Sequence, residues 1–127
     1  MDYESNIMNH KELNVWKESM ILVRDVYRLL KQFPSEEQFG LCSQMRRSVV
    51  SIPSNIAEGC GRNSDKELIR FCYISSGSIA ELETQLPISV ELQYIDDNHK
   101  IFAQLMIVKK LLLGFIRHLQ SKNKFAH

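Results

Sequence analysis

The sequence predicts an all-α protein, folded as an antiparallel up-down-up-down four-helix bundle with proline kinks in its second and third helices. Apolar residues recur every three to four positions along four segments, which is the helical period. The 127 residues include only 5 Gly and 3 Pro, too few for a fold with many tight turns. A chain of this length is expected to form one domain, residues 1–127, with an ordered core at about 13–120.

The first predicted helix spans about residues 13–33. One apolar stripe has alternating spacings of three and four, as in the buried seam of a bundle, and consists of Leu13, Trp16, Met20, Val23, Tyr27 and Leu30. A second stripe widens the apolar face and consists of Leu22, Val26, Leu29 and Phe33. Pro34 ends the helix, because the residue before a proline is pushed out of the α region.

The second predicted helix spans about residues 36–60. Ser35 and Gln38 match the capping-box pattern, so Ser35 is expected to cap the helix. Apolar positions keep one phase on both sides of Pro53, which predicts a kink there instead of a break; they are Leu41, Met45, Val49, Ile52 and Ile56. Gly59 and Gly61 are expected to end the helix in the left-handed C-cap conformation.

Asn55 is the polar residue of this helix that most needs a partner, since it lies between Ile52 and Ile56. Buried polar groups are normally hydrogen-bonded. We therefore expect its amide to satisfy a backbone group freed by Pro53, or a side chain on the third helix.

The third predicted helix spans about residues 65–92 and begins with a second capping box, Ser64 to Glu67. Its apolar face is formed by Leu68, Cys72, Ser75, Ile79, Leu82, Leu86 and Val90. The run from Ser75 through Gly77 to Ser78 contains weak helix formers, and its small side chains would allow a neighbouring helix to approach closely. Pro87 should bend this helix.

The fourth predicted helix spans about residues 98–120, with Asp96 or Asp97 as N-cap and a polar, frayed tail from Ser121. Its seam is Ile101, Leu105, Val108, Leu112, Phe115 and Leu119, with a second flank of Phe102, Met106, Leu113 and Ile116. The first and last helices thus carry more apolar residues than one interior needs. Because large exposed apolar patches are rare on monomers, a symmetric self-assembly is expected.

Charge is unevenly distributed along the chain. Residues 1–97 contain 10 Lys+Arg and 15 Asp+Glu, a net charge of −5, whereas residues 98–127 contain 6 Lys+Arg and no acid, a net charge of +6. Such asymmetry can mark a nucleic-acid surface. It is also expected where a basic helix lies beside acidic positions of its neighbours, and this second interpretation is favoured.

Cysteine usage and hydropathy indicate a cytoplasmic protein without a membrane segment. The 3 Cys are odd in number and show no metal-binding spacing, which favours reduced thiols over a disulfide framework. The start of the chain is polar and acidic, unlike a signal peptide. Every apolar run is far too short to span a bilayer.

The residues show no pattern typical of an enzyme, so no catalytic, metal or cofactor site is expected. A di-iron bundle needs Glu-x-x-His on two helices, and no Glu here has a His three residues later. Gly59 and Gly61 lack the preceding strand and the Lys-Ser/Thr of a phosphate loop. A small enzyme with its site between two subunits stays as the third alternative.

Four stretches resemble the four-helix-bundle family encoded in intervening sequences of bacterial 23S rRNA genes, sometimes labelled ribosomal protein. They are residues 44–59 (QMRRSVVSIPSNIAEG), 77–86 (GSIAELETQL), 13–17 (LNVWK) and 61–67 (GRNSDKE). The resemblance covers about residues 13–119. It implies a bundle that assembles into a ring-like homopentamer and has no well-defined molecular function.

A related branch of that family, the accessory proteins of diversity-generating retroelements, works with a reverse transcriptase and nucleic acid. That branch is strongly basic, whereas this chain has a net charge of +1. The sequence also departs from the family pattern at Ser75-Ser76, where Ala then Arg would be expected, and at Pro87, where an aliphatic residue is usual.

The basic residues have two interpretations. As a phosphate-binding set they would be Arg46, Arg47, Arg62, Lys66, Lys109 and Lys110. Because the second and third helices fold back around residue 61, the favoured interpretation is ion pairing of Arg47 with Glu81 and of Glu58 with Arg70.

The function expected from the sequence is that of a non-enzymatic, self-associating scaffold or adaptor that contacts rRNA or a nucleic-acid-processing protein. The alternative is a purely structural protein-interaction module without a nucleic-acid role. Residues expected to serve the fold in either case are Pro53, Asn55, Glu58, Gly59, Arg70, Gly77 and Glu81.

Overall fold

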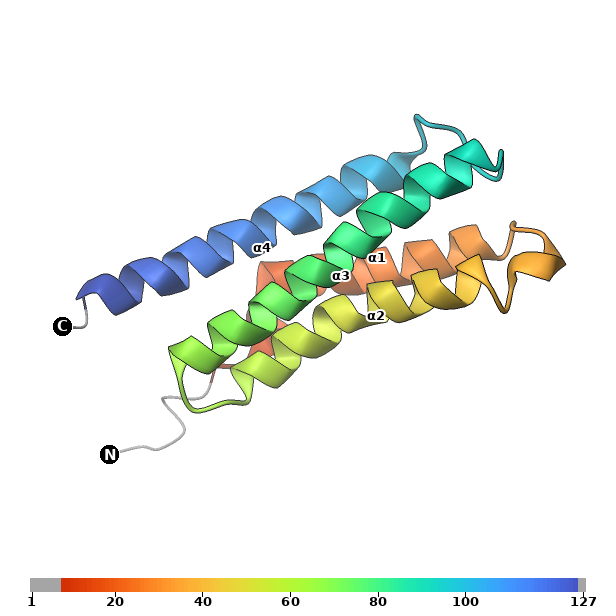
Figure 1. Cartoon of the computed structure of the whole chain (residues 1–127). Helices are drawn as coiled ribbons and strands as arrows, with labels where there is room; N and C mark the ends of the chain where they lie inside the picture. Colours follow the sequence, from red (N-terminus) through yellow and green to blue (C-terminus); the bar gives the residue numbers. More distant parts are fainter. Residues whose placement is uncertain (1–7, 126–127) are drawn as a thin grey trace.

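The computed structural model describes residues 8–125, and they are helical without any strand (Figure 1). Four α-helices are α1 (Asn14–Leu30), α2 (Leu41–Cys60), α3 (Asp65–Glu91) and α4 (Lys100–Phe125). Two short 3-10 helices precede α1 and α2, namely η2 (His10–Glu12) and η3 (Ser35–Glu37). The prediction of an all-α protein with four helices is confirmed.

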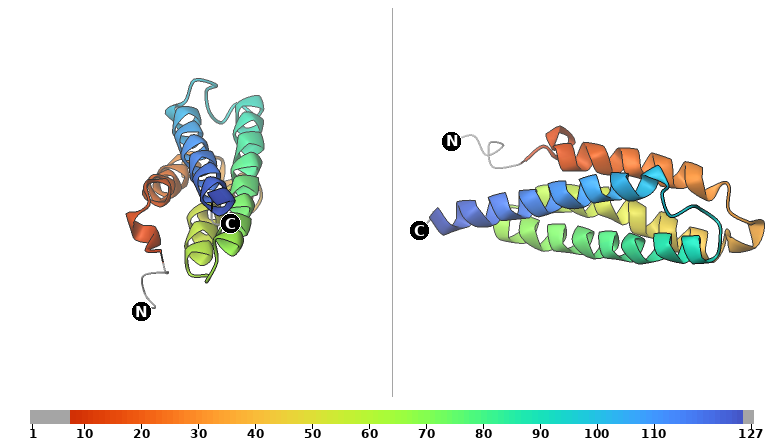
Figure 2. Two further views of the ribbon diagram at one scale, coloured as in Figure 1. Left: turned by 90° about the vertical axis from the view of Figure 1, so that its left-hand side faces the viewer. Right: turned by 90° about the horizontal axis from the view of Figure 1, so that it is seen from above.

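Neighbours in sequence are also neighbours in space. α2 packs on α1 and, most extensively, on α3, while α4 packs on both α3 and α1. In Figure 1 the chain runs to the right along α1 and α3 and to the left along α2 and α4. Figure 2 shows the same arrangement from one end and from above. One apolar core lies between the four helices and receives side chains from each of them.

The core uses the second apolar stripe of α1. Leu22, Val26 and Leu29 are buried, whereas Met20 and Tyr27 of the predicted seam are exposed. The predicted seam is therefore wrong at Met20 and Tyr27, whereas Leu30 is buried and Leu13, Trp16 and Val23 pack against the core. Two adjacent stripes of similar apolarity satisfy the helical period equally well, so the position of the neighbouring helices decides between them.

Helix α2 begins at Leu41, five residues later than predicted, and Ser35 makes no side-chain cap. Gln38 instead donates its amide Nε2–H to the carbonyl of Leu30 at the end of α1, at 3.1 Å. The guanidinium of Arg46 in turn donates to the carbonyl of Gln38, at 2.7 Å. Partners from two other segments thus hold residue 38 outside the helix.

Both internal prolines lie within continuous helices. Pro53 is inside α2 and Pro87 is inside α3. In α2 the predicted apolar positions Met45, Val49, Ile52 and Ile56, which lie before and after Pro53, are fully buried, and Leu41 is partly buried against the core. A break at Pro53 is thereby excluded.

The end of α2 depends on close packing instead of on a left-handed glycine. Gly61 has φ −80°, and among residues 8–125 no glycine has a positive φ, so the predicted C-cap conformation is wrong. Gly59 lies inside the helix against α3. A Cβ atom at residue 59 would come within 2.9 Å of both Leu68 Cδ1 and Phe71 Cβ. Glycine is required here because the two helices approach too closely for any side chain.

The remaining helix ends follow the sequence in part. Ser64 Oγ accepts a hydrogen bond from the Glu67 N–H at 3.2 Å, as its capping box predicts. At the start of α4 the cap is His99 and not Asp96 or Asp97, because His99 Nδ1 accepts from the Ile101 N–H at 3.0 Å. Helix α4 also continues to Phe125, so the tail is helical where fraying from residue 121 was predicted. Residues 126 and 127 lie outside the described range.

Polar contacts tie the helices together outside the core. Gln104 of α4 donates to Asp25 Oδ2 of α1 at 2.8 Å. Hydrogen bonds from Arg24 and then Gln104 lower the pKa of Asp25. At the other end, the Tyr94 hydroxyl donates to Glu37 Oε2 at 2.7 Å, which joins the loop after α3 to η3. This bond is the largest cause that raises the pKa of Tyr94 to about 12.

Replacing Gly59 with alanine should destabilise the fold. Overpacking against Leu68 and Phe71 costs about 1–3 kcal/mol, more than the roughly 1 kcal/mol that alanine gains over glycine in a helix. The matched control is Gly61→Ala at the same helix end, whose Cβ would lie at an ordinary 3.5 Å from its nearest neighbour. Urea unfolding should show a lower midpoint for Gly59→Ala alone, and equal midpoints for both variants would contradict this packing.

The Tyr94–Glu37 bond predicts that the Tyr94 phenol loses its proton at a higher pH than an ordinary tyrosine. Its raised pKa means that the bond stabilises the fold below the usual pKa of about 10 and that this contribution is lost as the pH rises through about 12. Ultraviolet titration of the folded protein should show one late phenol, absent in Tyr94→Phe and shifted to lower pH in Glu37→Gln. Simultaneous titration of all tyrosines in the folded protein would contradict the bond.

Candidate functional site

A polar strip interrupts the apolar contact between α2 and α3. The Ser75 hydroxyl donates to the Ile52 carbonyl at 2.9 Å, and the Ser78 hydroxyl donates to Ser51 Oγ at 2.8 Å. Ser75 and Ser78 are buried, whereas Gly77 is exposed and has open space around it. The small side chains predicted to admit a neighbouring helix therefore do so at two serines, and Gly77 faces away from α2.

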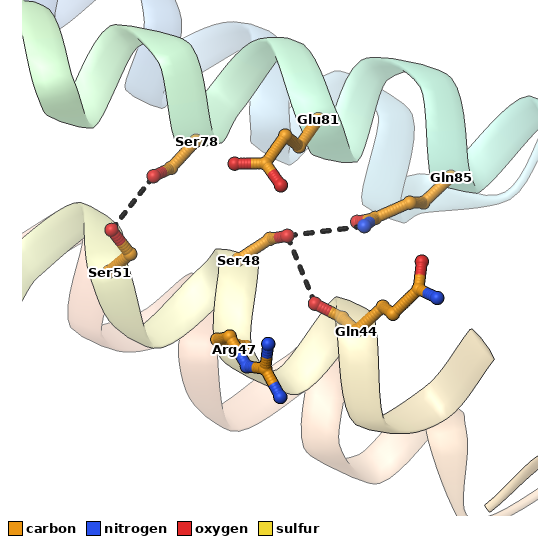
Figure 3. Close-up of a pocket in the computed structure, with 7 residues that line it drawn as sticks. All are labelled: Gln44, Arg47, Ser48, Ser51, Ser78, Glu81 and Gln85. Atoms are coloured by element: carbon orange, nitrogen blue, oxygen red, sulfur yellow. Dashed lines mark hydrogen bonds between the residues drawn. The ribbon is translucent and has the colours of Figure 1, made fainter. Parts of the chain in front are cut away.

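Beside this strip the two helices form an open groove of about 380 Å³ (Figure 3). Gln44, Arg47, Ser48 and Ser51 line it from α2, and Ser78, Glu81 and Gln85 line it from α3. Every one of these side chains is polar. We call this feature the α2–α3 groove.

Gln85 is one of three buried residues of the groove, with Ser48 and Ser78, and only 7% of its surface is exposed. Its amide Nε2–H donates to Ser48 Oγ at 3.2 Å, and the Ser48 hydroxyl donates to the Gln44 carbonyl at 3.0 Å. Its amide oxygen Oε1 is buried and has no hydrogen-bond partner among the described residues. An acceptor left unsatisfied in this way costs about 1–3 kcal/mol, so the groove contains a group that lacks a donor.

The two predicted interhelical ion pairs are absent from residues 8–125. Arg47 and Glu81 both line the groove, but no pair within 4.0 Å joins them. Glu58 pairs with Arg62 at 3.4 Å. These partners lie one helical turn apart, where neighbouring side chains meet without reaching to another helix.

Arg70 likewise pairs within its own helix and not with Glu58. Its Nε lies 3.0 Å from Glu67 Oε2, and hydrogen bonding to Arg70 is the largest cause that lowers the pKa of Glu67. The guanidinium of Arg70 also lies 4.5 Å from the centre of the Phe71 ring, and that of Arg62 lies 5.0 Å from it. The arginines of this turn are therefore held against the protein surface.

Asn55 bonds within α2 and not to the backbone group that Pro53 frees. Its Nδ2 donates to both the carbonyl and the hydroxyl oxygen of Ser51, at 2.9 Å each. The Ser51 hydroxyl oxygen also accepts from Ser78, so Asn55 reaches α3 through Ser51. The prediction of a direct bond to α3, or to a freed carbonyl, is wrong, because the nearest acceptors lie one turn earlier on the same helix.

The six residues predicted as nucleic-acid contacts do not form one cluster. Arg46 and Arg47 lie in the first half of α2, Arg62 and Lys66 lie at the turn into α3, and Lys109 and Lys110 lie in the middle of α4. Arg46 bonds to Gln38, and Arg62 pairs with Glu58. Lys66 and Lys110 are exposed. Positive charge is thus spread over three places.

The basic α4 lies beside acidic residues of α3, as the favoured interpretation of the charge asymmetry predicts. Lys109 Nζ lies 2.8 Å from Glu83 Oε2, and Lys122 Nζ lies 3.4 Å from Asp65 Oδ2. Part of the charge of α4 is therefore compensated within the chain.

The cysteine thiols are buried in the core. The 3 Cys are free and buried, and desolvation raises the pKa of Cys60 to about 11 and that of Cys72 to about 12. Protonated buried thiols are poor nucleophiles. In the part of the chain that the structure describes, no three His, Cys, Asp or Glu side chains are grouped to hold a metal ion.

Sequence reasoning missed the groove as a site, although it named Arg47 and Glu81. A signal was present. Polar residues on α2 recur at Gln44, Ser48, Ser51 and Asn55, with the same spacing of three and four as the apolar seam. On α3 they recur at Ser75, Ser78, Glu81 and Gln85. Two polar stripes on helices that fold back on each other indicate a polar contact, and the position of residue 61 sets their register.

Comparison with known proteins supports the resemblance found in the sequence. No curated protein matches the chain. The family model described as "23S rRNA-intervening sequence protein" matches residues 11–114, which is most of the chain. In the described part of the chain, no helix has the length and apolarity needed to cross a membrane. The match to the family model, together with the four-helix fold, shows that the chain belongs to the 23S rRNA-intervening sequence protein family.

Proposed function

We propose that the chain is a non-enzymatic, cytoplasmic scaffold that assembles with copies of itself and contacts RNA or a nucleic-acid-processing protein. Its subunit is an antiparallel up-down-up-down bundle, bent at Pro53 and Pro87. Membership of the family supports this proposal, since the resemblance implies a homopentameric ring.

The observation that carries the proposal is the apolar character of the outer faces of α1 and α4. Exposed large apolar side chains there are Met20 (44% exposed), Ile21 (37%), Tyr27 (40%), Met106 (43%) and Ile107 (50%). Each exposed apolar Å² that becomes buried on association contributes about 25 cal/mol. These faces therefore favour contact with another apolar protein surface. A second copy of the chain presents such a surface.

Disrupting these faces should dissociate the assembly. Light scattering on the wild type should give a multiple of 14.8 kDa, about 74 kDa for a pentamer. The double variant Met20→Glu/Met106→Glu should give the monomer mass with an unchanged helical circular dichroism spectrum, because charge at a buried contact is costly. The control Ser54→Glu/Ser121→Glu adds equal charge at exposed polar positions and should keep the wild-type mass. A monomeric wild type would contradict the proposal.

RNA contact is supported by exposed basic residues that make no ion pair among residues 8–125. Lys66 and Lys110 are exposed and make no ion pair within 4.0 Å among residues 8–125. Arg47 also makes none, and it lies at the edge of the groove. An assembly repeats these charges in each subunit, so a weak phosphate contact of one chain is multiplied.

Binding to a single-stranded 23S rRNA fragment should weaken steeply with salt. For single strands the slope of log affinity against log salt is about −0.7 per phosphate contact. Lys66→Gln/Lys110→Gln should therefore flatten the slope by about 1.4 for each subunit that contacts the strand, whereas the exposed pair Lys17→Gln/Lys31→Gln should leave it unchanged. Anisotropy titrations at several salt concentrations measure this. Equal slopes for both double variants would contradict contact through Lys66 and Lys110.

The alternative function, a protein-interaction module without nucleic acid, is favoured by one observation. Three of the six predicted contacts, Arg46, Arg62 and Lys109, already bind groups of the same chain. Absence of RNA binding at low salt by an intact oligomer would decide for this alternative.

A further inference from the structure

The two walls of the α2–α3 groove have complementary chemistry. From α3 come the exposed carboxylate of Glu81 and, covered beneath the surface of the groove, the unpartnered Oε1 of Gln85. From α2 come donors, the guanidinium of Arg47 and the amide of Gln44. Figure 3 shows Glu81 and Gln85 on α3 and Gln44 and Arg47 on α2, with the guanidinium of Arg47 turned away from Glu81. A ligand that fits must present hydrogen-bond donors to α3 and acceptors to α2.

Among the bases of RNA, guanine fits this pattern best. It carries adjacent N1–H and N2–H donors on one edge and the acceptors O6 and N7 on the next, whereas adenine, cytosine and uracil each have a single donor group on their pairing edge. Carboxylates accept from such N–H groups, and arginine donates to O6 and N7. RNA-binding proteins commonly take up single, splayed-out bases in this way.

Gln85 provides an independent argument for a ligand with an extra donor. It is 93% buried, and its Oε1 lacks a donor while its Nε2 is held by Ser48. The N2 amine of a guanine in the groove would supply the hydrogen bond that Oε1 lacks. For this the Gln85 amide must turn outward and give up its bond to Ser48. The other bases have no second amine or imine donor for it.

The lining of the groove favours a base over a protein segment. None of the seven residues that line the groove is apolar. The apolar face of a docked helix would therefore find no apolar side chain to pack against.

We propose that the α2–α3 groove binds an unpaired guanine of single-stranded RNA, with Glu81 and Gln85 accepting from its N1–H and N2–H groups and Arg47 facing its acceptors. This inference rests on the proposed RNA contact and adds base specificity to it. The basic residues elsewhere hold the phosphates, and the groove reads the base.

The test uses the full-length protein and short oligouridylates whose central base is guanine, hypoxanthine, adenine or uracil. Hypoxanthine is guanine without the N2 amine. Anisotropy should show about tenfold tighter binding for guanine than for uracil, within the range of a good base contact. Hypoxanthine should bind more weakly than guanine.

Two variants assign the preference to the groove. Glu81→Gln, at an exposed position, should reduce the preference for guanine over uracil. Gln85→Met should remove the preference for guanine over hypoxanthine. Glu83→Gln is the control, since Glu83 pairs with Lys109 outside the groove, and it should leave both preferences intact. If Gln85→Met fails to fold, the Glu81→Gln and hypoxanthine results still decide.

The outcomes separate the groove from the broader proposal. Salt-dependent binding of equal strength to all four oligonucleotides overturns the groove assignment and leaves the RNA contact standing. No binding to any of them at low salt overturns both. A change of oligomer mass in Glu81→Gln, without a change in base preference, overturns the assignment in favour of a contact between subunits.

Discussion

The close approach of α2 and α3 is the constraint on which the rest of the structure depends. At one end Gly59 brings the α2 backbone against Leu68 and Phe71, and in the middle Ser75 bonds directly to the Ile52 carbonyl. Larger side chains at these positions would push the helices apart. The polar side chains through which the two helices approach each other lie beside the groove or line it. The packing of α2 on α3 and the candidate site therefore depend on the same polar contacts.

The sequence predicted the elements well, because the helical period is a local property. The seams of α2, α3 and α4 are buried almost throughout, as their spacing indicates, with Met45, Leu82 and Leu112 among the best-covered side chains. In α1 the spacing permitted two stripes, and the choice between Leu22 and Met20 depends on neighbours that no local pattern describes. The exposed stripe that results is also the basis for the proposed assembly.

Helix ends and polar partners could be predicted less well, since both depend on residues distant in sequence. Gln38 leaves its expected place in a helix because carbonyls at the end of α1 accept its amide. Arg47 and Glu81 were correctly predicted to lie near each other, yet proximity alone does not produce an ion pair. Gly59 was predicted to end α2 as a C-cap, whereas its role in close helix packing can be recognised only from the positions of atoms on α3.

The short connection between α2 and α3 has a consequence for the chain entropy lost on folding. Only residues 61–64 separate these helices, so their contacts close small loops and lose little chain entropy. Contacts between α1 and α4, by contrast, join opposite ends of the chain. Of the three connections between consecutive α-helices, this one is the shortest, so closing the α2–α3 hairpin costs the least chain entropy. The groove is lined by this hairpin alone, so its two walls are joined by the shortest connection between α-helices in the bundle.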